Sequence, residues 1–550
     1  MSTRRGYPVF RAPGGPSRAA AARDGLPGMV TVREASLAVL RGHGITTIFG
    51  NPGSTELPMF RDFPDDFRYV LGLQESVAVG AADGYAQGTG RAALVNLHSA
   101  AGVGHALGNV FTAFRNRTPL VLVAGQQARS LLVGEPFLFA ERPAEFPEPY
   151  VKYSREPARA ADVPATLARA IHVATTPPCG PVLVSVPVDD WDQPAPAVPP
   201  HTVVGTVAGD PQALAQVADE LAAARAPAFV VGGEVDRDGA FDDVVALAER
   251  HAARVYVAPM SPRCGFPERH RLFGGFLPAA HDGIRAALDA HDVVVVLGSP
   301  VFPFHTEGAV PGDTAVPDAT TLVQLTEDPA HAAWTPVGTS IVTGVRHGVR
   351  ALLAGPTPPR RPFPAPGVSA GRVAADGDVI TEELLLQTLA DLRPADSVVV
   401  EEAPATRGPM HAHLPFDRAA SFYTCASGGL GHGLPAAVGM ALARPERVVA
   451  LVGDGSAMYG IQALWSAAQL GVALTVVVVH NARYRALDQF AEHFGITKPV
   501  GTALPGLDFV ALAAGQGVAG VRVERPDELE PALAEALRSP GPVVLDVIVA

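Results

Sequence analysis

Cysteine is scarce in this sequence, and so are long apolar runs. The 550 residues include only three cysteines, Cys179, Cys264 and Cys425, which stand far apart without a CxxC spacing. A disulfide framework or a zinc site is therefore not expected, and a reducing compartment such as the cytoplasm is favoured. No apolar stretch reaches the roughly 18 to 20 residues of a membrane span, so we expect no membrane partner.

Positively charged residues are also outnumbered by negatively charged ones. Lys and Arg number 42 against 55 Asp and Glu, the formal net charge is -13, and no basic run occurs beyond the extreme N-terminus. This balance argues against a nucleic-acid groove. Hydrophobic residues make up 48% of the chain and charged residues 18%, which is typical of a compact globular protein.

Three segments of unusual composition divide the chain. Residues 1–28 are rich in Ala, Arg, Gly and Pro and lack the apolar run of a secretory signal, so we predict a short disordered tail, with Met29 favoured as the natural start. Proline-rich segments at 194–204 and 355–377 predict two linkers. Domains are therefore expected at 29–193, 205–354 and 378–550.

Within these domains, short β-branched runs alternate with stretches rich in Ala and Leu. The runs are apolar on both faces, which is typical of parallel strands covered by helices on both sides. Such strands are predicted at 47–50, 92–98, 120–124, 228–231, 255–257, 293–297, 397–400, 448–452, 474–479 and 542–549. The predicted fold is α/β, with three doubly wound parallel-sheet domains.

The most specific chemical signal is a pair of strand ends in the third domain. The run 448–452 leads into Gly453-Asp454-Gly455-Ser456, and the run 474–479 leads to Asn481. Ligands of an open parallel sheet collect beyond the carboxyl ends of its strands. There a carboxylate, an amide and a backbone carbonyl suit a hard cation such as Mg2+, and the glycines let the backbone approach phosphate oxygens. The pattern predicts a metal and diphosphate site.

Glu75 is the candidate partner of this motif in the first domain. It follows the strand-like run 69–73 and precedes a predicted helix of small residues at 76–87. A glutamate that caps a surface helix would show the same pattern. Glu75 gains weight as a functional residue only because it accompanies the third-domain motif.

Together these motifs resemble the thiamine-diphosphate-dependent 2-oxo acid decarboxylases, and benzoylformate decarboxylases most of all. The resemblance covers essentially Met29 to the C-terminus. It rests on NPGSTELP at 51–58, LQE at 73–75, NLHSAAG at 96–102, AGQQ at 124–127, SVPVDDWD at 185–192, VAP at 257–259, PRC at 262–264, CASGGLG at 425–431 and ALW at 463–465.

The resemblance implies four catalytic residues. Glu75 would bond the pyrimidine ring of the cofactor, and Ser54 would bind and polarise the substrate carboxylate. His98 would act as acid and base at the substrate oxygen, and His305 would protonate the carbon that CO2 leaves. A pair of histidines suits alternating protonations because imidazole titrates near neutrality.

The resemblance also implies thiamine diphosphate and Mg2+, or Ca2+, as cofactors. The Gly428 carbonyl would accept the pyrimidine amino group, and Leu430 would hold the cofactor bent. Asp454, Asn481 and the backbone carbonyl of Arg483 would ligate the metal. The other residues expected at the cofactor are Gly453, Gly455, Ser456 and Tyr484.

The chain departs from the family where the metal motif ends. A paired asparagine followed by glycine is usual, but this chain has His480-Asn481-Ala482-Arg483-Tyr484-Arg485. Alanine at 482 costs little if its φ is negative and up to a few kcal/mol if φ is positive. The two arginines either neutralise phosphate or lie in solvent.

Further departures concern the phosphate side and the substrate pocket. Pro404 and Ala405 stand where benzoylformate decarboxylases carry hydroxyl residues, and Thr424 stands where they place a pocket phenylalanine. The substrate is therefore less determined than the reaction. An aryl glyoxylate such as benzoylformate is expected first, and a hydroxylated or differently shaped 2-oxo acid second.

The same residues leave three alternative functions to weigh against decarboxylation, and the resemblance also implies an oligomer. A carboligase like acetolactate synthase or benzaldehyde lyase would use the same cofactor, but the two histidines favour decarboxylation with protonation. An oxidase is disfavoured because the middle domain has no clear flavin signature. A catalytically silent cofactor-binding protein is disfavoured by the joint presence of these residues, but a loss of cofactor affinity through the departures at 482–485 would favour it. The resemblance implies a homodimer or homotetramer, with the cofactor between two chains and a small-molecule 2-oxo acid as substrate.

Overall fold

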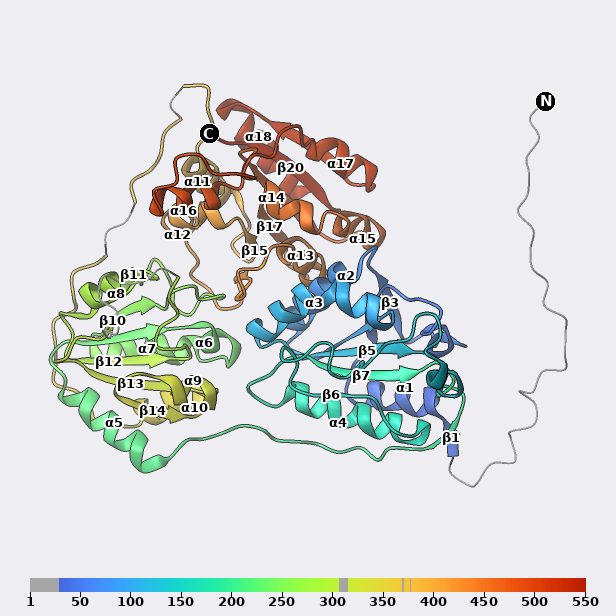
Figure 1. Cartoon of the computed structure of the whole chain (residues 1–550). Helices are drawn as coiled ribbons and strands as arrows, with labels where there is room; N and C mark the ends of the chain where they lie inside the picture. Colours follow the sequence, from blue (N-terminus) through green and yellow to red (C-terminus); the bar gives the residue numbers. More distant parts are fainter. Residues whose placement is uncertain (1–28, 306–314, 368–369, 376) are drawn as a thin grey trace, which may run out of the picture.

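A computed structural model describes residues 29–305, 315–367, 370–375 and 377–550 (Figure 1). The predicted tail at 1–28 lies outside the described residues. The model contains three six-stranded parallel sheets, each flanked by helices, which confirms the predicted fold class. Among the described helices, none is long and apolar enough to cross a bilayer.

The first domain has the strand order β3-β2-β4-β5-β7-β6. Its strands are β2 (Thr47–Gly50), β3 (Arg68–Leu71), β4 (Ala93–Leu97), β5 (Leu120–Gln126), β6 (Ser154–Arg155) and β7 (Val182–Pro187), and its helices are α1 (Val32–Gly42), α2 (Glu75–Thr89), α3 (Ser99–Asn116) and α4 (Val163–Thr175). β4 and β5 are buried throughout, as expected for strands covered on both faces. A small antiparallel ribbon pairs β1 (Met29–Thr31) with β8 (Pro194–Pro196).

The middle domain has the strand order β11-β10-β9-β12-β13-β14. Its strands are β9 (Pro227–Val231), β10 (Arg254–Val257), β11 (Phe273–Phe276), β12 (Val293–Leu297), β13 (Thr321–Thr326) and β14 (Thr339–Val342). Its helices are α5 (Pro211–Ala223), α6 (Gly233–Arg237), α7 (Phe241–His251), α8 (His281–Leu288), α9 (Pro329–Trp334) and α10 (Val345–Leu353).

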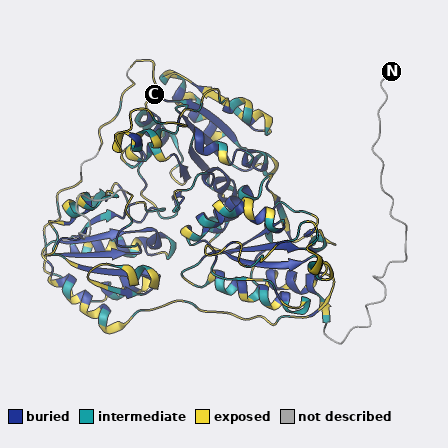
Figure 2. Cartoon of the chain, in the orientation of Figure 1, coloured by how far each residue is buried: buried dark blue, intermediate teal, exposed yellow. Residues whose placement is uncertain are grey.

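The third domain repeats the arrangement with the order β16-β15-β17-β18-β20-β19. Its strands are β15 (Val398–Glu402), β16 (Phe422–Thr424), β17 (Val448–Gly453), β18 (Leu474–His480), β19 (Ala519–Val523) and β20 (Val543–Ile548). Its helices are α11 (Glu382–Leu392), α12 (Arg407–His413), α13 (Gly433–Ala443), α14 (Asp454–Tyr459), α15 (Ala463–Leu470), α16 (Arg485–His493), α17 (Phe509–Gly515) and α18 (Pro526–Arg538). In every domain the central strands are buried, and exposed residues lie on the helices, the loops and outer strands such as β19 (Figure 2).

Helix α2 of the first domain packs closely on helix α13 of the third (Figure 1). A Cβ at Gly84 would lie 1.9 Å from the Ala436 carbonyl oxygen, and a Cβ at Gly439 would lie 1.8 Å from the Ala81 carbonyl oxygen. The two helices therefore approach backbone to backbone, which only glycine permits at these positions. This contact fixes the carboxyl edge of the third sheet relative to α2 and α3.

Candidate active site

At the carboxyl edge of the third sheet, a carboxylate and an amide share one hydrogen-bond donor. β17 and β18 are neighbours, and Asp454 and Asn481 each follow one of them. The Arg483 backbone N–H donates to Asp454 Oδ2 at 3.3 Å and to Asn481 Oδ1 at 3.1 Å. Two oxygens on one donor lie close together, which is the arrangement that a hard cation requires.

Asp454 is buried, and burial raises the pKa of its carboxyl group. The rise is opposed by backbone N–H groups, among them that of Gly455, which donates to Asp454 Oδ1 at 2.6 Å, and by the nearby His480. A cation at this point would favour the ionised form of the carboxylate.

Ala482 adopts a left-handed backbone conformation, with φ of 56°. The sequence left the sign of this angle open, and the positive value makes alanine the costlier choice by about 1 kcal/mol or more relative to glycine. Hydrogen bonds on both sides hold the segment: the Leu504 N–H donates to the Ala482 carbonyl at 2.8 Å, and the Tyr484 N–H donates to the Thr502 carbonyl at 2.7 Å. The strain thus lies within the segment that carries Asn481.

A cavity of about 350 Å³ opens beside these groups. Its lining includes many of the predicted residues: His305, Gly428, Leu430, Gly453, Asp454, Gly455, Ser456, Asn481, Arg483 and Tyr484. Gly455 has no room for a side chain, because a Cβ would lie 2.2 Å from the Tyr484 ring. Gly428 has φ of 71°, a conformation that favours glycine.

His305 brings the middle domain to this cavity. Its ring meets the Phe490 ring of α16 edge to face, with centroids 4.7 Å apart, and its backbone N–H donates to the Ala279 carbonyl at 3.0 Å. Pro404 and Ala405 line the same cavity. They offer it no hydroxyl, and Pro404 offers no backbone N–H either.

Ser54, Glu75 and His98 are not among the residues that line this cavity. They follow the neighbouring strands β2, β3 and β4, so they gather at the carboxyl edge of the first sheet. The described chain therefore presents the predicted site as two half-sites. The first-domain half-site comprises Ser54, Glu75 and His98, and the third-domain half-site is the 350 Å³ cavity.

A buried glutamate that the sequence reasoning missed orients His98. His98 Nδ1 lies 2.9 Å from Glu56 Oε2 and 3.2 Å from Thr55 Oγ1, and Glu56 is 2% exposed. The Gly53 N–H donates to the same glutamate oxygen at 2.8 Å. A Cβ at Gly53 would lie only 2.0 Å from His98 Nδ1, so the glycine makes room for the ring. Glu56 belongs to the 51–58 string, and its place two residues after Ser54 was the available signal.

Glu75 is the first residue of α2 and also a neighbour of His98. Gln74 caps the helix by accepting the Val77 N–H at 3.1 Å. A Cβ on Gly102 of α3 would meet Glu75 Oε1 at 3.2 Å and His98 Cβ at 3.4 Å, so Gly102 lies between the two side chains. Glu75 therefore begins the helix without capping it, and its role at the pyrimidine ring stays a prediction.

A second buried glutamate, Glu402 at the end of β15, supports the loop that carries Gly428 and Leu430. It accepts the Gly431 N–H at 2.5 Å and the His432 N–H at 2.8 Å. Burial raises the pKa of Glu402 to about 7, against the opposing effect of these backbone donors. Nothing in the sequence singled out this residue beyond its place after an apolar run.

Thr424, expected in the substrate pocket, is buried and bound to a charged side chain. Arg407 Nη2 donates to Thr424 Oγ1 at 2.7 Å, and Arg407 Nε donates to Glu401 Oε2 at 3.1 Å. Thr424 is absent from the lining of the 350 Å³ cavity. The threonine therefore anchors an arginine, and its hydroxyl is already engaged in this contact.

Each half-site is bordered by exposed apolar side chains. Leu57 and Leu73, close in sequence to Ser54 and Glu75, are 61% and 44% exposed. Tyr459 and Leu487, which line the third-domain cavity, are 59% and 52% exposed. Apolar groups left in water around a polar centre are typical of surfaces that another molecule covers.

The third-domain half-site fits a diphosphate held through Mg2+. Its donor set is hard: the Asp454 carboxylate and the Asn481 amide oxygen, beside Gly453, where a Cβ would meet nothing closer than 3.8 Å. Asp454 and Asn481 keep this arrangement despite the departures at 482–485. Glu75, the predicted pyrimidine partner, belongs to the other half-site.

Family models of thiamine pyrophosphate enzymes match all three domains. The N-terminal TPP binding domain matches residues 30–138, the central domain matches 214–352 and the C-terminal TPP binding domain matches 406–547.

Three similar proteins share nearly the whole chain. Benzoylformate decarboxylase of Pseudomonas aeruginosa is 44% identical over 524 residues, covering 94% of this chain and 99% of the relative. The structure of the thiamine diphosphate-dependent 4-hydroxybenzoylformate decarboxylase of Rhodococcus jostii RHA1 has a TM-score of 0.90 at 39% identity, covering 94% and 99%. The structure of benzoylformate decarboxylase from Polynucleobacter necessarius has a TM-score of 0.90 at 37% identity, covering 94% of this chain and 98% of that one. The chain therefore belongs to the thiamine pyrophosphate enzyme family.

Proposed function

We propose that this protein catalyses the non-oxidative decarboxylation of an aryl 2-oxo acid to the aldehyde and CO2, using thiamine diphosphate and a divalent metal, typically Mg2+. The observation that carries the proposal is the 44% identity to a benzoylformate decarboxylase across 94% of the chain. The retained residues of both half-sites support it. The three cysteines are free thiols, which agrees with a reducing, cytoplasmic location.

The cofactor, when bound, supplies the carbon nucleophile and the electron sink that allow CO2 to leave. Asp454, Asn481 and the Arg483 carbonyl hold the metal, and Glu75 sets the protonation of the pyrimidine ring. Ser54 binds the substrate carboxylate. These roles for the chain's own residues rest on their matching positions and on the geometry of the two half-sites.

Two histidines carry the proton transfers. His98 Nδ1 is committed to Glu56, so Nε2 is the nitrogen that exchanges a proton with the substrate oxygen. His305, beside Phe490 at the third-domain cavity, delivers a proton to the carbon from which CO2 departs. A carboligase would instead need room for a second carbonyl at this carbon, and the position of His305 favours decarboxylation.

We also propose that a second copy of this chain completes the site. The first-domain residues do not line the cavity of the third domain, and exposed apolar side chains border both half-sites. Joining the first-domain half-site of one copy to the cavity of another in a dimer gives two equivalent sites. A homotetramer would pair two such dimers.

The direct test is CO2 release from purified protein supplied with Mg2+, thiamine diphosphate and a panel of 2-oxo acids. Benzoylformate and 4-hydroxybenzoylformate are expected to react faster than phenylpyruvate or pyruvate, with one aldehyde formed per CO2. Cofactor binding without CO2 release from any of these acids would overturn the proposal. A product joining two substrate skeletons as the main outcome would identify a carboligase.

A further inference from the structure

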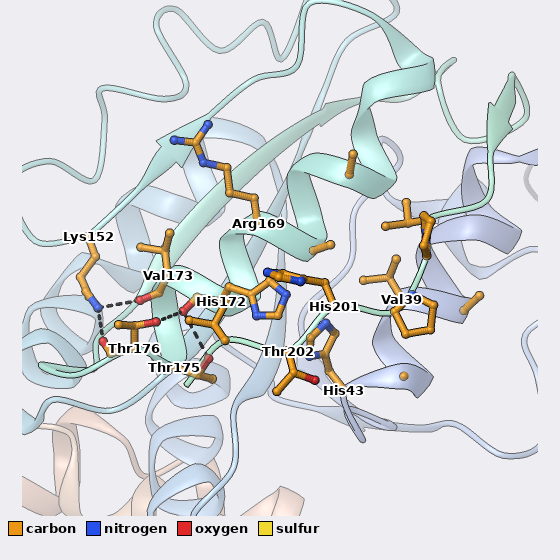
Figure 3. Close-up of a pocket in the computed structure, with 18 residues that line it drawn as sticks. Val39, His43, Lys152, Arg169, His172, Val173, Thr175, Thr176, His201 and Thr202 are labelled. Carbon is orange, nitrogen blue, oxygen red and sulfur yellow. Dashed lines mark hydrogen bonds between the residues drawn. The ribbon is translucent and has the colours of Figure 1, made fainter. Parts of the chain in front are cut away.

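A cavity of about 850 Å³ lies away from both half-sites (Figure 3). It is formed by α1, α4 and the segment 198–203, which leads from the first domain toward the middle domain. α1 and α4 cover one face of the first sheet, and α2 and α3 cover the other. The cavity is therefore separated by the sheet from the helices that contact the third domain.

Three imidazole rings stand in a row in this cavity (Figure 3). His172 of α4 lies between His43, which follows α1, and His201 of the connecting segment, with ring centroids 4.9 and 5.2 Å apart. Among the described residues, no three His, Cys, Asp or Glu side chains are placed to hold one metal ion. The row is therefore not explained as a metal site.

The charge of the lining has one sign. It contains Lys152 and Arg169 beside the three histidines, and no Asp or Glu. Lys152 Nζ donates to the Val173 and Thr176 carbonyls at 2.6 Å each, which leaves one of its three N–H groups. Arg169 lies over the Tyr153 ring, 5.2 Å from its centroid.

The carboxylates that act on Lys152 come from the middle domain and are already paired. Glu327 and Asp328 act on Lys152 from a distance. Asp328 is bonded to Arg117, and Glu327 lies 3.6 Å from Arg237. The positive groups of the cavity therefore have no carboxylate of their own within it.

Most of the remaining lining is apolar, with three threonines among it. The apolar residues include Val39, Val173, Val198, Pro199, Pro200 and Val203. The volume is within the range of about 300 to 1,000 Å³ typical of small-molecule sites. Imidazole and ammonium groups beside a broad apolar wall match a carboxylate on an apolar body, whereas a bare inorganic anion would leave the wall unused.

We propose that this cavity is a second binding site, for a small organic acid with one carboxylate and an apolar body, such as an aryl carboxylate. The histidines supply the hydrogen bonds and charge, and the valines and prolines contact the ring. Burial and the neighbouring ring lower the pKa of His43 and of His172, so both are largely neutral at pH 7 in the free protein. A bound carboxylate favours their protonated forms, so binding tightens as the pH falls.

The test is equilibrium dialysis of the holoenzyme with radiolabelled benzoate at pH 6 and pH 8. We expect His172→Gln and His201→Gln each to bind one benzoate fewer per chain than the wild type, or to bind it with an affinity at least tenfold weaker. His201 is exposed on the connecting segment, so its replacement leaves the core intact. His347→Gln, a change at an exposed histidine of α10, is the control and should lose nothing.

Benzoate held at the half-sites is distinguished by the same variants, because neither histidine lies there. In the wild type, the benzoate that the two variants fail to bind should be held several times more tightly at pH 6 than at pH 8. Unchanged benzoate binding in both variants would overturn the proposal. Displacement of that equivalent by inorganic phosphate at equal concentration would also overturn it, because the apolar wall would then contribute nothing.

Discussion

Asp454 and Asn481 converge on the backbone N–H of Arg483, at 3.3 and 3.1 Å, although they follow different strands. The convergence arises because β17 and β18 are adjacent and parallel, which brings their carboxyl ends to one edge. This pair is the geometric basis for assigning the metal and diphosphate to the third domain.

Replacing either member of this pair should weaken cofactor binding. Asp454→Asn and Asn481→Ala are each expected to reduce the Mg2+-dependent affinity for thiamine diphosphate by about 10- to 100-fold or more, because each removes an oxygen ligand or its charge. Isothermal titration with the cofactor measures this directly. Asp508→Asn, a change at an exposed helix cap, should leave the affinity unchanged. Wild-type affinity in both site variants would refute the metal assignment.

Ala482→Gly should stabilise the protein. The residue sits at φ of 56°, where glycine avoids a strain of about 1 kcal/mol. The thermal midpoint is expected to rise and the cofactor to bind slightly more tightly. Ala215→Gly is the matched control. It lies exposed inside α5, where the same change should lower stability by about 1 kcal/mol. A fall in both variants would contradict the strain argument.

Glu56→Gln should slow turnover without weakening cofactor binding. The carboxylate lies 2.9 Å from His98 Nδ1, and replacing it removes the charged acceptor that orients the ring. We expect kcat to fall by about 10- to 100-fold, a typical range for general acid–base support. Steady-state kinetics with cofactor titration separate the two effects. An unchanged kcat would show that Glu56 is only a buried structural residue.

Two inactive variants should restore activity when mixed. Glu75→Gln damages the first-domain half-site and Asp454→Asn damages the cavity of the third domain. If two copies share each site, a mixed dimer has one intact site and one doubly damaged site, so complete subunit exchange should recover about a quarter of wild-type activity. No recovery after exchange, shown by mass spectrometry of tagged chains, would mean that each chain builds its own site.

Glu402 should make stability depend on pH. Its pKa is raised to about 7 in the folded protein, above its ordinary value of 4.5. Protonation of Glu402 therefore contributes to the free energy of unfolding. This contribution is fully present below pH 4.5 and is lost as the pH rises through about 7, a change on the order of 3 kcal/mol. Urea unfolding at pH 5 and pH 8 should show this loss in the wild type and less of it in Glu402→Gln. Identical pH dependence in both proteins would exclude Glu402 as its source.

The sequence by itself determined the fold class and most of the central strands, and it placed the candidate metal motif at two strand ends. Apolar runs predicted the central strands, such as β5 and β18, because burial on both faces demands apolar residues at every position. It did not predict α3, whose three glycines interrupt the helical pattern. It also missed the inner strands β7 and β13 and the outer strands β6, β11, β14, β16 and β19. The local sequence also placed Asp454 and Asn481 at strand ends, where parallel topology brings them together.

Tertiary structure alone decided which groups meet across the chain. The Glu56 carboxylate meets His98 because β2 and β4 are neighbours, and the left-handed angle of Ala482 follows from hydrogen bonds to residues about 20 positions away. The histidine row joins His43, which follows α1, to His172 of α4 and His201 of the connecting segment, which no local pattern links. Local spacing encodes which residues end an element, whereas packing between elements sets the distances between their side chains.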